Sequence, residues 1–160
     1  MLRARHGRPD PVWPRPLTRS FETVSYHNNM YRLTERRPIA ALPFSAYISK
    51  FLYNNRFQSL LVAPVVAGIN PDGSTVIVSY DSIGAITYSR FVAAGTTSNE
   101  LIGVSDSFYR ENLEPDALVE TVAQCMNAAV NRDALAGFGI DVVLLTRSGM
   151  TTYKFGARQD

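Results

Sequence analysis

LVETVAQCMNAAVNRDALAGFGIDVVLLT, residues 118–146, changes from a helical to an extended hydrophobic pattern at a glycine-marked turn. Its first part has an apolar stripe at the three- and four-residue spacing of an amphipathic helix, formed by Leu118, Val122, Cys125, Met126 and Ala129. Residues 140–146 are apolar and largely β-branched, which favours a buried strand. We expect Gly137-x-Gly139 to cap the C-terminus of the helix.

Outward from this stretch, helices and strands alternate in groups. Helical patterns are expected over residues 21–36, 45–55, 97–108 and 115–130. Extended patterns are expected over residues 60–67, 75–80, 85–88, 91–94, 140–146 and 150–155. The order helix–helix, strands, helix–helix, strands predicts an α+β protein, with helices outside and antiparallel sheets inside.

Turn and cap residues mark the element boundaries. Asn70-Pro71-Asp72-Gly73 predicts one hairpin turn, and Arg147-Ser148-Gly149 predicts another. Thr97 with Glu100 matches a capping box at a helix start, and Ser45 is the expected N-cap of the second helix.

Length, charge and cysteine use narrow the class of protein. The 160 residues suit one domain with a real core, and the net charge of +2 is too small to indicate nucleic-acid or membrane binding. The single cysteine, Cys125, excludes an internal disulfide and is interpreted as a small core residue. Neither a membrane-spanning run nor the apolar core of a secretory signal is evident.

Residues 1–20 differ from the rest in composition. They contain Pro9, Pro11, Pro14 and Pro16, and five arginines against one aspartate. Because proline disfavours helix interiors and central strands, we predict a basic, proline-rich, disordered arm. An organelle presequence and a nucleic-acid-binding arm are weaker alternatives, because the prolines would break an amphipathic helix and the rest of the chain is not basic.

Most of the binding or catalytic sites that these motifs suggest lack the residues or the chain direction that such a site requires. Gly137-x-Gly139 runs from helix into strand, the reverse of a phosphate-binding loop. Gly95-Thr96-Thr97 runs from strand into helix, but no lysine follows it, and a helix cap is the favoured interpretation. His6 and His27 have no partner at metal-ligand spacing, and no GxSxG motif supports a serine triad.

Two further sets of residues have both a structural and a functional interpretation. For the aromatic residues at 26–31 and at 47, 51 and 53, packing in the core and at interfaces is favoured over a base-stacking platform. Asp133, beside Arg132, forms either a local ion pair or cap at a helix end, or part of an active-site floor.

From about Phe21 to Asp160 the chain resembles the proteasome β-type subunit family. The ordered matching pieces are residues 64–68 (PVVAG), 81–84 (DSIG), 91–96 (FVAAGT), 109–115 (YRENLEP), 118–121 (LVET), 131–137 (NRDALAG) and 157–160 (ARQD). Each piece is weak alone, but their order and spacing across nearly all of the non-basic chain are specific.

The resemblance implies a truncated form of the N-terminal-nucleophile hydrolase fold, a four-layer αββα sandwich with antiparallel sheets over residues 21–160. Reactive members use an N-terminal threonine, its own amine and a nearby lysine, all on opening strands for which this sequence has no counterpart. They also have serine where this chain has Ala94 and Ala136, whereas Asp133 keeps its place.

The family therefore implies a non-catalytic structural subunit, with no catalytic, cofactor-binding or metal-binding residues. Its expected partners are neighbouring β subunits and α-ring subunits of the 20S core, in ATP- and ubiquitin-dependent degradation in cytoplasm and nucleus. No nucleic-acid or membrane partner is expected. Residues 97–106 are the candidate segment for lining a neighbour's substrate pocket. The alternative is a threonine-type peptidase subunit whose nucleophile segment is missing from this chain.

The absent opening strands give a first prediction. Without them, central strands would expose unpaired backbone edges, so the isolated chain should be poorly stable or prone to aggregation. A cooperative thermal unfolding transition of the isolated 160-residue chain would contradict this expectation.

Overall fold

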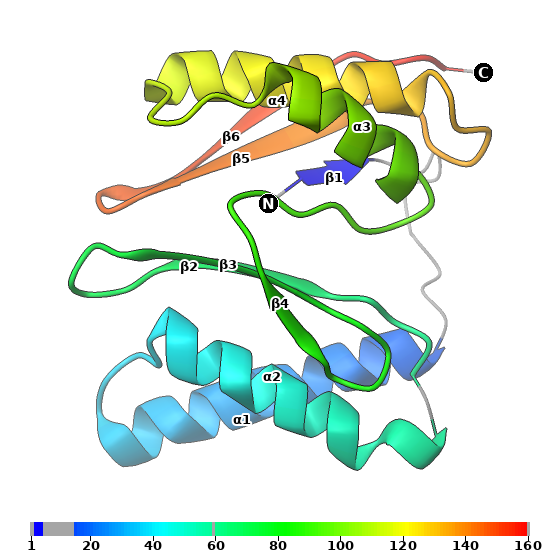
Figure 1. Cartoon of the computed structure of the whole chain (residues 1–160). Helices are drawn as coiled ribbons and strands as arrows, with labels where there is room; N and C mark the ends of the chain where they lie inside the picture. The colour runs from blue at the N-terminus through cyan, green and yellow to red at the C-terminus, as the bar shows by residue number, and fades with distance from the viewer. Residues whose placement is uncertain (1, 5–14, 59, 160) are drawn as a thin grey trace. The chain divides into compact units, whose positions relative to one another are not determined.

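The computed structural model describes residues 2–4, 15–58 and 60–159, and it contains two compact units. The described residues within 12–92 form the central unit, and the described residues within 1–11 and 93–160 form the C-terminal unit. Each unit combines a pair of α-helices with a three-stranded antiparallel sheet (Figure 1). The predicted α+β class with antiparallel sheets is therefore confirmed.

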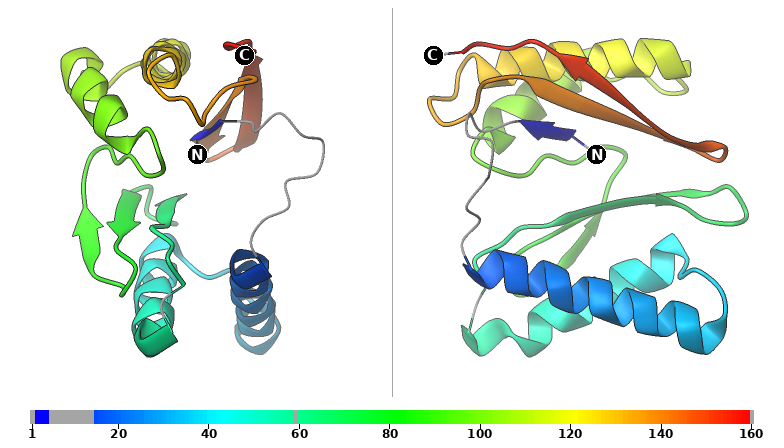
Figure 2. Two further views of the ribbon diagram at one scale, coloured as in Figure 1. Left: turned by 90° about the vertical axis from the view of Figure 1, so that its right-hand side faces the viewer. Right: turned by 180° about the vertical axis from the view of Figure 1, so that it is seen from behind.

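The central unit has its helix pair on one face of its sheet. Its strands follow the order β2-β3-β4, and the β2–β3 register runs from Val65↔Ser79 to Ile69↔Thr75. Two views agree that the helices lie side by side (Figure 2). The elements are α1 (Arg15–Glu35), α2 (Ala41–Asn54), the 3₁₀ helix η1 (Arg56–Gln58), β2 (Val65–Ile69), β3 (Thr75–Tyr80) and β4 (Ile86–Tyr88).

The core of the central unit forms between α2 and β3. Along β3, burial alternates so that Val76, Val78 and Tyr80 face the core, as the two-residue period of a strand requires. Ile48 and Leu52 of α2 belong to the same buried cluster. The strand predicted at residues 75–80 and its hairpin turn at residues 70–73 are both confirmed.

Ser45 lies inside α2 and does not cap it, contrary to the prediction. The helix begins at Ala41 with Ala40 as N-cap and no side-chain cap bond. Pro43 falls in the first turn, where its missing amide costs no helical hydrogen bond, so the helix can start before it. Ser45 is fully buried, and its hydroxyl donates to the Leu42 carbonyl at 2.7 Å.

Tyr80 is buried, and its hydroxyl donates to the Ser45 carbonyl at 2.8 Å. Burial raises the pKa of Tyr80 from 10.0 to about 12. The stability from the neutral phenol is therefore fully present below pH 10.0 and is lost as pH rises towards 12. We expect this loss to be about 2–3 kcal/mol and to disappear in Tyr80→Phe. Urea denaturation at pH 9 to 12 measures it, with the exposed Tyr26→Phe as control; equal pH dependence in both variants would contradict it.

The C-terminal unit also places both helices on one side of its sheet (Figure 1). Its strands follow the order β1-β5-β6, and the β5–β6 hairpin pairs Ile140↔Phe155 through Thr146↔Gly149. The elements are β1 (Leu2–Ala4), α3 (Ser98–Phe108), α4 (Pro115–Val130), β5 (Ile140–Thr146) and β6 (Gly149–Phe155).

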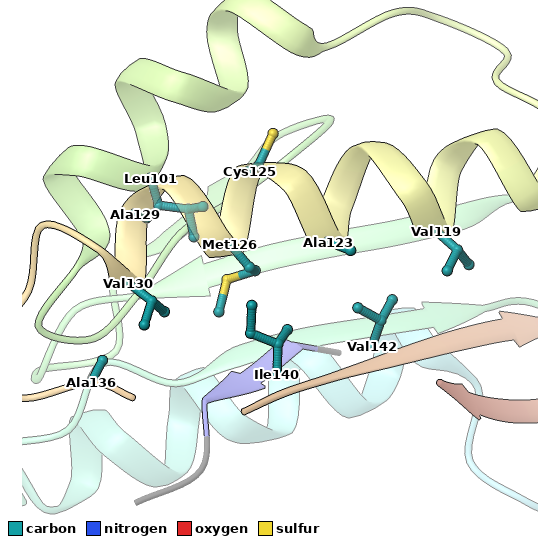
Figure 3. Close-up of a cluster of buried hydrophobic side chains, with 10 residues drawn as sticks. All are labelled: Leu101, Val119, Ala123, Cys125, Met126, Ala129, Val130, Ala136, Ile140 and Val142. Carbon is teal, nitrogen blue, oxygen red and sulfur yellow. The ribbon is translucent and has the colours of Figure 1, made fainter. Parts of the chain in front are cut away.

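The second core lies between α4 and β5. Met126 and Val130 of α4 point towards Ile140 of β5 (Figure 3). Ile140 and Val130 are among the most buried side chains described. The buried face of α4 is rotated relative to the predicted stripe. Val119 and Ala123, which were not in the stripe, are buried, whereas Leu118, which was, is 40% exposed. The strand predicted at residues 140–146 is confirmed with the same ends.

The predicted disordered arm at residues 1–20 is wrong at both of its described ends. Leu2–Ala4 forms β1, which pairs antiparallel with residues 140–142 of β5. Helix α1 begins at Arg15 and continues through the boundary placed at residue 20. The prediction considered only helix interiors and central strands, but Pro16 lies in the first turn of α1, where proline is tolerated. Residues 5–14, with most of the arm's prolines and His6, lie outside the described residues.

Three boundary predictions also need correction. Helix α4 ends at Val130, with Asn131 as C-cap, so Gly137 and Gly139 lie in the loop that follows and do not cap it. Residues 91–94 are not a strand. The strand expected at residues 60–67 instead runs from Val65 to Ile69, after Pro64, because proline cannot donate to a sheet ladder.

Candidate functional site

The loop between α4 and β5, residues 131–139, contains the acidic residue for which the sequence left a functional role open. Asp133 holds this loop through both carboxylate oxygens. Its Oδ2 accepts a hydrogen bond of 2.5 Å from the Thr96 hydroxyl, and its Oδ1 accepts one of 2.9 Å from the Leu135 amide. The structure thus favours a structural role, in which Asp133 braces the loop, and it differs from the sequence interpretation in that the partners are Thr96 and Leu135.

The C-terminal tail fixes the same loop from another direction. Arg158 donates through Nη2 to the Asp133 carbonyl at 2.6 Å. The Arg158 carbonyl in turn accepts from the Phe138 amide at 2.7 Å. Phe138 has a φ of +62°, an uncommon conformation for a residue with a side chain. The hydrogen bond to the tail helps to hold Phe138 in that conformation.

Neither Thr96 nor Arg158 could be identified as a partner from the sequence. They lie 37 and 25 residues from Asp133, respectively, and no local spacing relates them. The fold brings them together because α3 starts, α4 ends and the chain terminates near the same end of the C-terminal unit (Figure 1).

The two alanines that replace serines of the reactive pattern have different surroundings. Ala136 is 6% exposed and belongs to the buried cluster with Val130 and Ile140 (Figure 3). Ala94 is exposed, whereas the preceding Ala93 packs against that cluster. A methyl group therefore fills the position after the Asp133 turn, where the family pattern places a hydroxyl.

The segment at residues 97–106 forms the first part of α3. Thr97 occupies the N-cap position, but no side-chain hydrogen bond caps the helix, so that part of the capping-box prediction is wrong. Thr97 is 8% exposed and Leu101 is buried, which fixes one face of the helix on the core. Asn99, Glu100 and Asp106 are exposed.

Cys125 behaves as a core residue, as the sequence indicates. It is 5% exposed, and burial raises the pKa of its thiol above the ordinary value. A raised pKa lowers the thiolate fraction at neutral pH, which disfavours nucleophilic chemistry.

His27 and its aromatic neighbours form a packing cluster in the central unit. The His27 Nδ1 lies 2.8 Å from the Thr23 carbonyl, and its ring centroid lies 5.6 Å from that of Tyr47. The ring centroids of Tyr47 and Phe51 are 6.3 Å apart. In the part of the chain that the structure describes, no three side chains of His, Cys, Asp or Glu gather as a metal site would require. None of the described helices is both long and apolar enough to cross a membrane.

A surface hollow of about 470 Å³ lies between α4 and the β5–β6 hairpin. Its lining includes the apolar side chains of Val119, Ile140 and Tyr153, and Asp116 and Glu120 of α4. Asp133, Thr96 and Arg158 do not line it, so this hollow is separate from the braced loop.

The brace gives a prediction that a double-mutant cycle can test. Asp133→Ala should destabilise the 131–139 loop by about 1.5–3 kcal/mol, because a charged acceptor of two hydrogen bonds is lost. Thr96→Val should cost less, and the two changes should be non-additive because the residues are bonded to each other. Hydrogen exchange of the Leu135 and Phe138 amides measures the effect, with exposed Asp116→Ala as control. Simple additivity would contradict the direct bond.

Comparisons with known sequences identify the family of this chain. A family model described as "Proteasome subunit" matches residues 19–145. Proteasome subunit beta type-3 of Saccharomyces cerevisiae is 39% identical over 141 residues, which is 87% of this chain and 69% of the relative. The beta type-3 subunits of Caenorhabditis elegans and Drosophila melanogaster are 36% and 35% identical, each over 87% of this chain and 69% of their own length. The chain therefore belongs to the proteasome subunit family, and these similar relatives are all beta type-3 subunits.

Proposed function

We propose that this chain is a non-catalytic structural subunit of the β ring of the 20S proteasome core. In this role it contributes to particle assembly and to the chamber wall during ATP- and ubiquitin-dependent protein degradation, in cytoplasm and nucleus. Its partners are neighbouring β subunits and α-ring subunits. Membership in the proteasome subunit family and the similarity to beta type-3 subunits support the proposal.

The buried methyl group of Ala136 is the observation that carries the non-catalytic part of the proposal. Reactive members place a serine hydroxyl in the Arg-Asp-x-x-Ser-Gly turn, and this chain has Ala136 there, packed in the hydrophobic cluster. Asp133 is present, but its carboxylate accepts hydrogen bonds from the Thr96 hydroxyl and the Leu135 amide. Acyl transfer requires a nucleophile and a group that carries its proton. A carboxylate that only braces a loop supplies neither of them.

The finer fold assignment belongs to the same proposal. Family membership supports the four-layer N-terminal-nucleophile hydrolase sandwich, because that is the fold that the resemblance implies. The segment at residues 97–106, whose exposed residues include Glu100 and Asp106, remains our candidate for lining a neighbour's substrate pocket.

Affinity purification of the tagged full chain from native cells tests this function. We expect co-recovery of other proteasome subunits at stoichiometric levels, in a fraction that sediments as the assembled core. Mass spectrometry of that fraction identifies the partners. Recovery of the chain without other proteasome subunits would refute the proposal.

Activity measurements separate the structural role from the peptidase alternative. Labelling of purified particles with a threonine-directed covalent inhibitor should leave this chain unmodified while labelling other subunits. Ala136→Ser should remain unlabelled, because a hydroxyl at residue 136 supplies neither an N-terminal threonine nor its amine. Covalent labelling of the unmodified chain would instead establish the peptidase alternative.

A further inference from the structure

Arg56, the first residue of η1, has its guanidinium over two aromatic rings. Its guanidinium carbon is 4.1 Å from the centroid of Tyr53 and 4.3 Å from the centroid of Phe57. Its Nη1 donates to the Tyr53 carbonyl at 3.0 Å. We name these three residues the arginine clamp. Both rings are largely in solvent, with Tyr53 54% and Phe57 87% exposed.

The end of the helix that holds the clamp is itself braced. Asn55 donates through Nδ2 to the Phe51 carbonyl at 2.7 Å, and its amide donates to the Leu52 carbonyl at 3.0 Å. Leu52 is 3% exposed and fixes this turn on the core of the central unit. The backbone that carries Tyr53 and leads into Arg56 is therefore fixed before any partner binds, which lowers the conformational entropy that binding would cost.

The surrounding sequence is basic. Residues 36–71 contain four basic side chains and no aspartate or glutamate; the basic residues are Arg36, Arg37, Lys50 and Arg56. In the described part of the chain Arg37 reaches Glu35 at 4.0 Å, whereas Arg56 has no carboxylate within that distance. Lys50 lies one helical turn before Tyr53 and adds to the positive charge on this end of α2.

We propose that the arginine clamp is a docking point for a carboxylate-bearing segment of a neighbouring protein subunit. The rings lie against the guanidinium, and its remaining N–H donors match the two oxygens of a carboxylate. Tyrosine and arginine are also enriched among residues that dominate interface energies. A nucleic-acid partner is disfavoured because the whole chain has a net charge of only +2. The inference rests on the proposed function, which supplies neighbouring subunits as partners.

A photo-crosslinking amino acid at Gln58 tests the proposal without altering the clamp, because Gln58 is exposed in η1. The full tagged chain is expressed in cells, irradiated and purified, and crosslinked peptides are identified by mass spectrometry. We expect a crosslink to another proteasome subunit, within a few residues of an aspartate or glutamate. Arg56→Glu should lower the crosslink yield by at least about tenfold, and Arg56→Lys by less, because lysine retains the charge but not the planar fork.

Arg110→Glu is the matched control. Arg110, like Arg56, donates through Nη1 to a backbone carbonyl, that of Tyr109 at 3.1 Å. It is exposed, so it tests charge reversal away from the clamp. Its crosslink yield should equal that of the unmodified chain. Reversing the partner's carboxylate to arginine should restore the crosslink in Arg56→Glu, which a merely misfolded variant would not allow.

The outcomes separate this inference from the proposed function. Crosslinks to RNA, to lipid or to a protein segment without acidic residues would overturn the inference, as would equal yields from Arg56→Glu and the unmodified chain. So would no crosslink at all from a chain that still co-purifies with proteasome subunits. Failure of the unmodified chain to co-purify with those subunits would instead refute the proposed function.

Discussion

Ile140→Ala should lower the free energy of unfolding of the C-terminal unit by about 2–5 kcal/mol. Ile140 is 1% exposed and begins β5, where it meets Met126 and Val130 of α4 (Figure 3). Removing its outer carbons loses their transfer free energy and leaves a cavity between the strand and the helix, which cannot close fully because both elements are held at many other points. Pulse proteolysis of the full chain across a urea series, at low protein concentration, measures the shift in midpoint.

Two matched variants on the same strand test the cause. Ile140→Val removes one methylene and should cost about 0.5–1.5 kcal/mol. Leu145→Ala removes more carbon, but Leu145 is 44% exposed, so it should cost less than about 1 kcal/mol. If Leu145→Ala were as damaging as Ile140→Ala, the assignment of the core to the α4–β5 contact would be wrong.

Strands with strong local signals could be predicted from the sequence. Residues 75–80 alternate in burial along β3 and follow a proline–aspartate–glycine turn, so pattern and turn chemistry agree. Residues 140–146 form β5 with the predicted ends for a similar reason, because apolar residues continue up to the turn at Arg147. The order of helix pairs and hairpins was sufficient for the α+β class and, through the ordered motifs, for the family.

Features that depend on contacts between distant residues could not be predicted in this way. The motifs indicated Asp133, but its partners Thr96 and Arg158 come from the start of α3 and from the C-terminal tail. Position-dependent effects caused other errors. Pro16 was counted among the prolines that predict a disordered arm, although it lies in the first turn of α1. Thr97 occupies the N-cap position of α3 without making the side-chain cap bond. In both cases the residue type has the expected general tendency, but its position within the helix determines whether that tendency has an effect.

Gly84→Ala should destabilise the central unit by at least about 3 kcal/mol, through backbone strain together with a steric clash. Gly84 has a φ of +90°, and a Cβ added there would lie 2.4 Å from the Ser49 carbonyl oxygen and 3.1 Å from the Tyr53 amide nitrogen of α2. Backbone atoms of a helix cannot rotate away as a side chain can, so α2 would have to move from the turn before β4. The same urea series with pulse proteolysis measures the loss.

Gly95→Ala and Ser49→Ala separate the contributions to that loss. Gly95 has a φ of +105° but nothing within 4 Å of an added Cβ, so its substitution isolates the conformational penalty, about 1–2 kcal/mol. Ser49 donates to the Gly84 carbonyl at 2.6 Å, and Ser49→Ala should cost about 1 kcal/mol through the lost hydrogen bond alone. Because the clash acts in Gly84→Ala but in neither control, that variant should be clearly the least stable of the three. Equal losses in Gly84→Ala and Gly95→Ala would show that α2 does not approach the turn closely enough to exclude a methyl group.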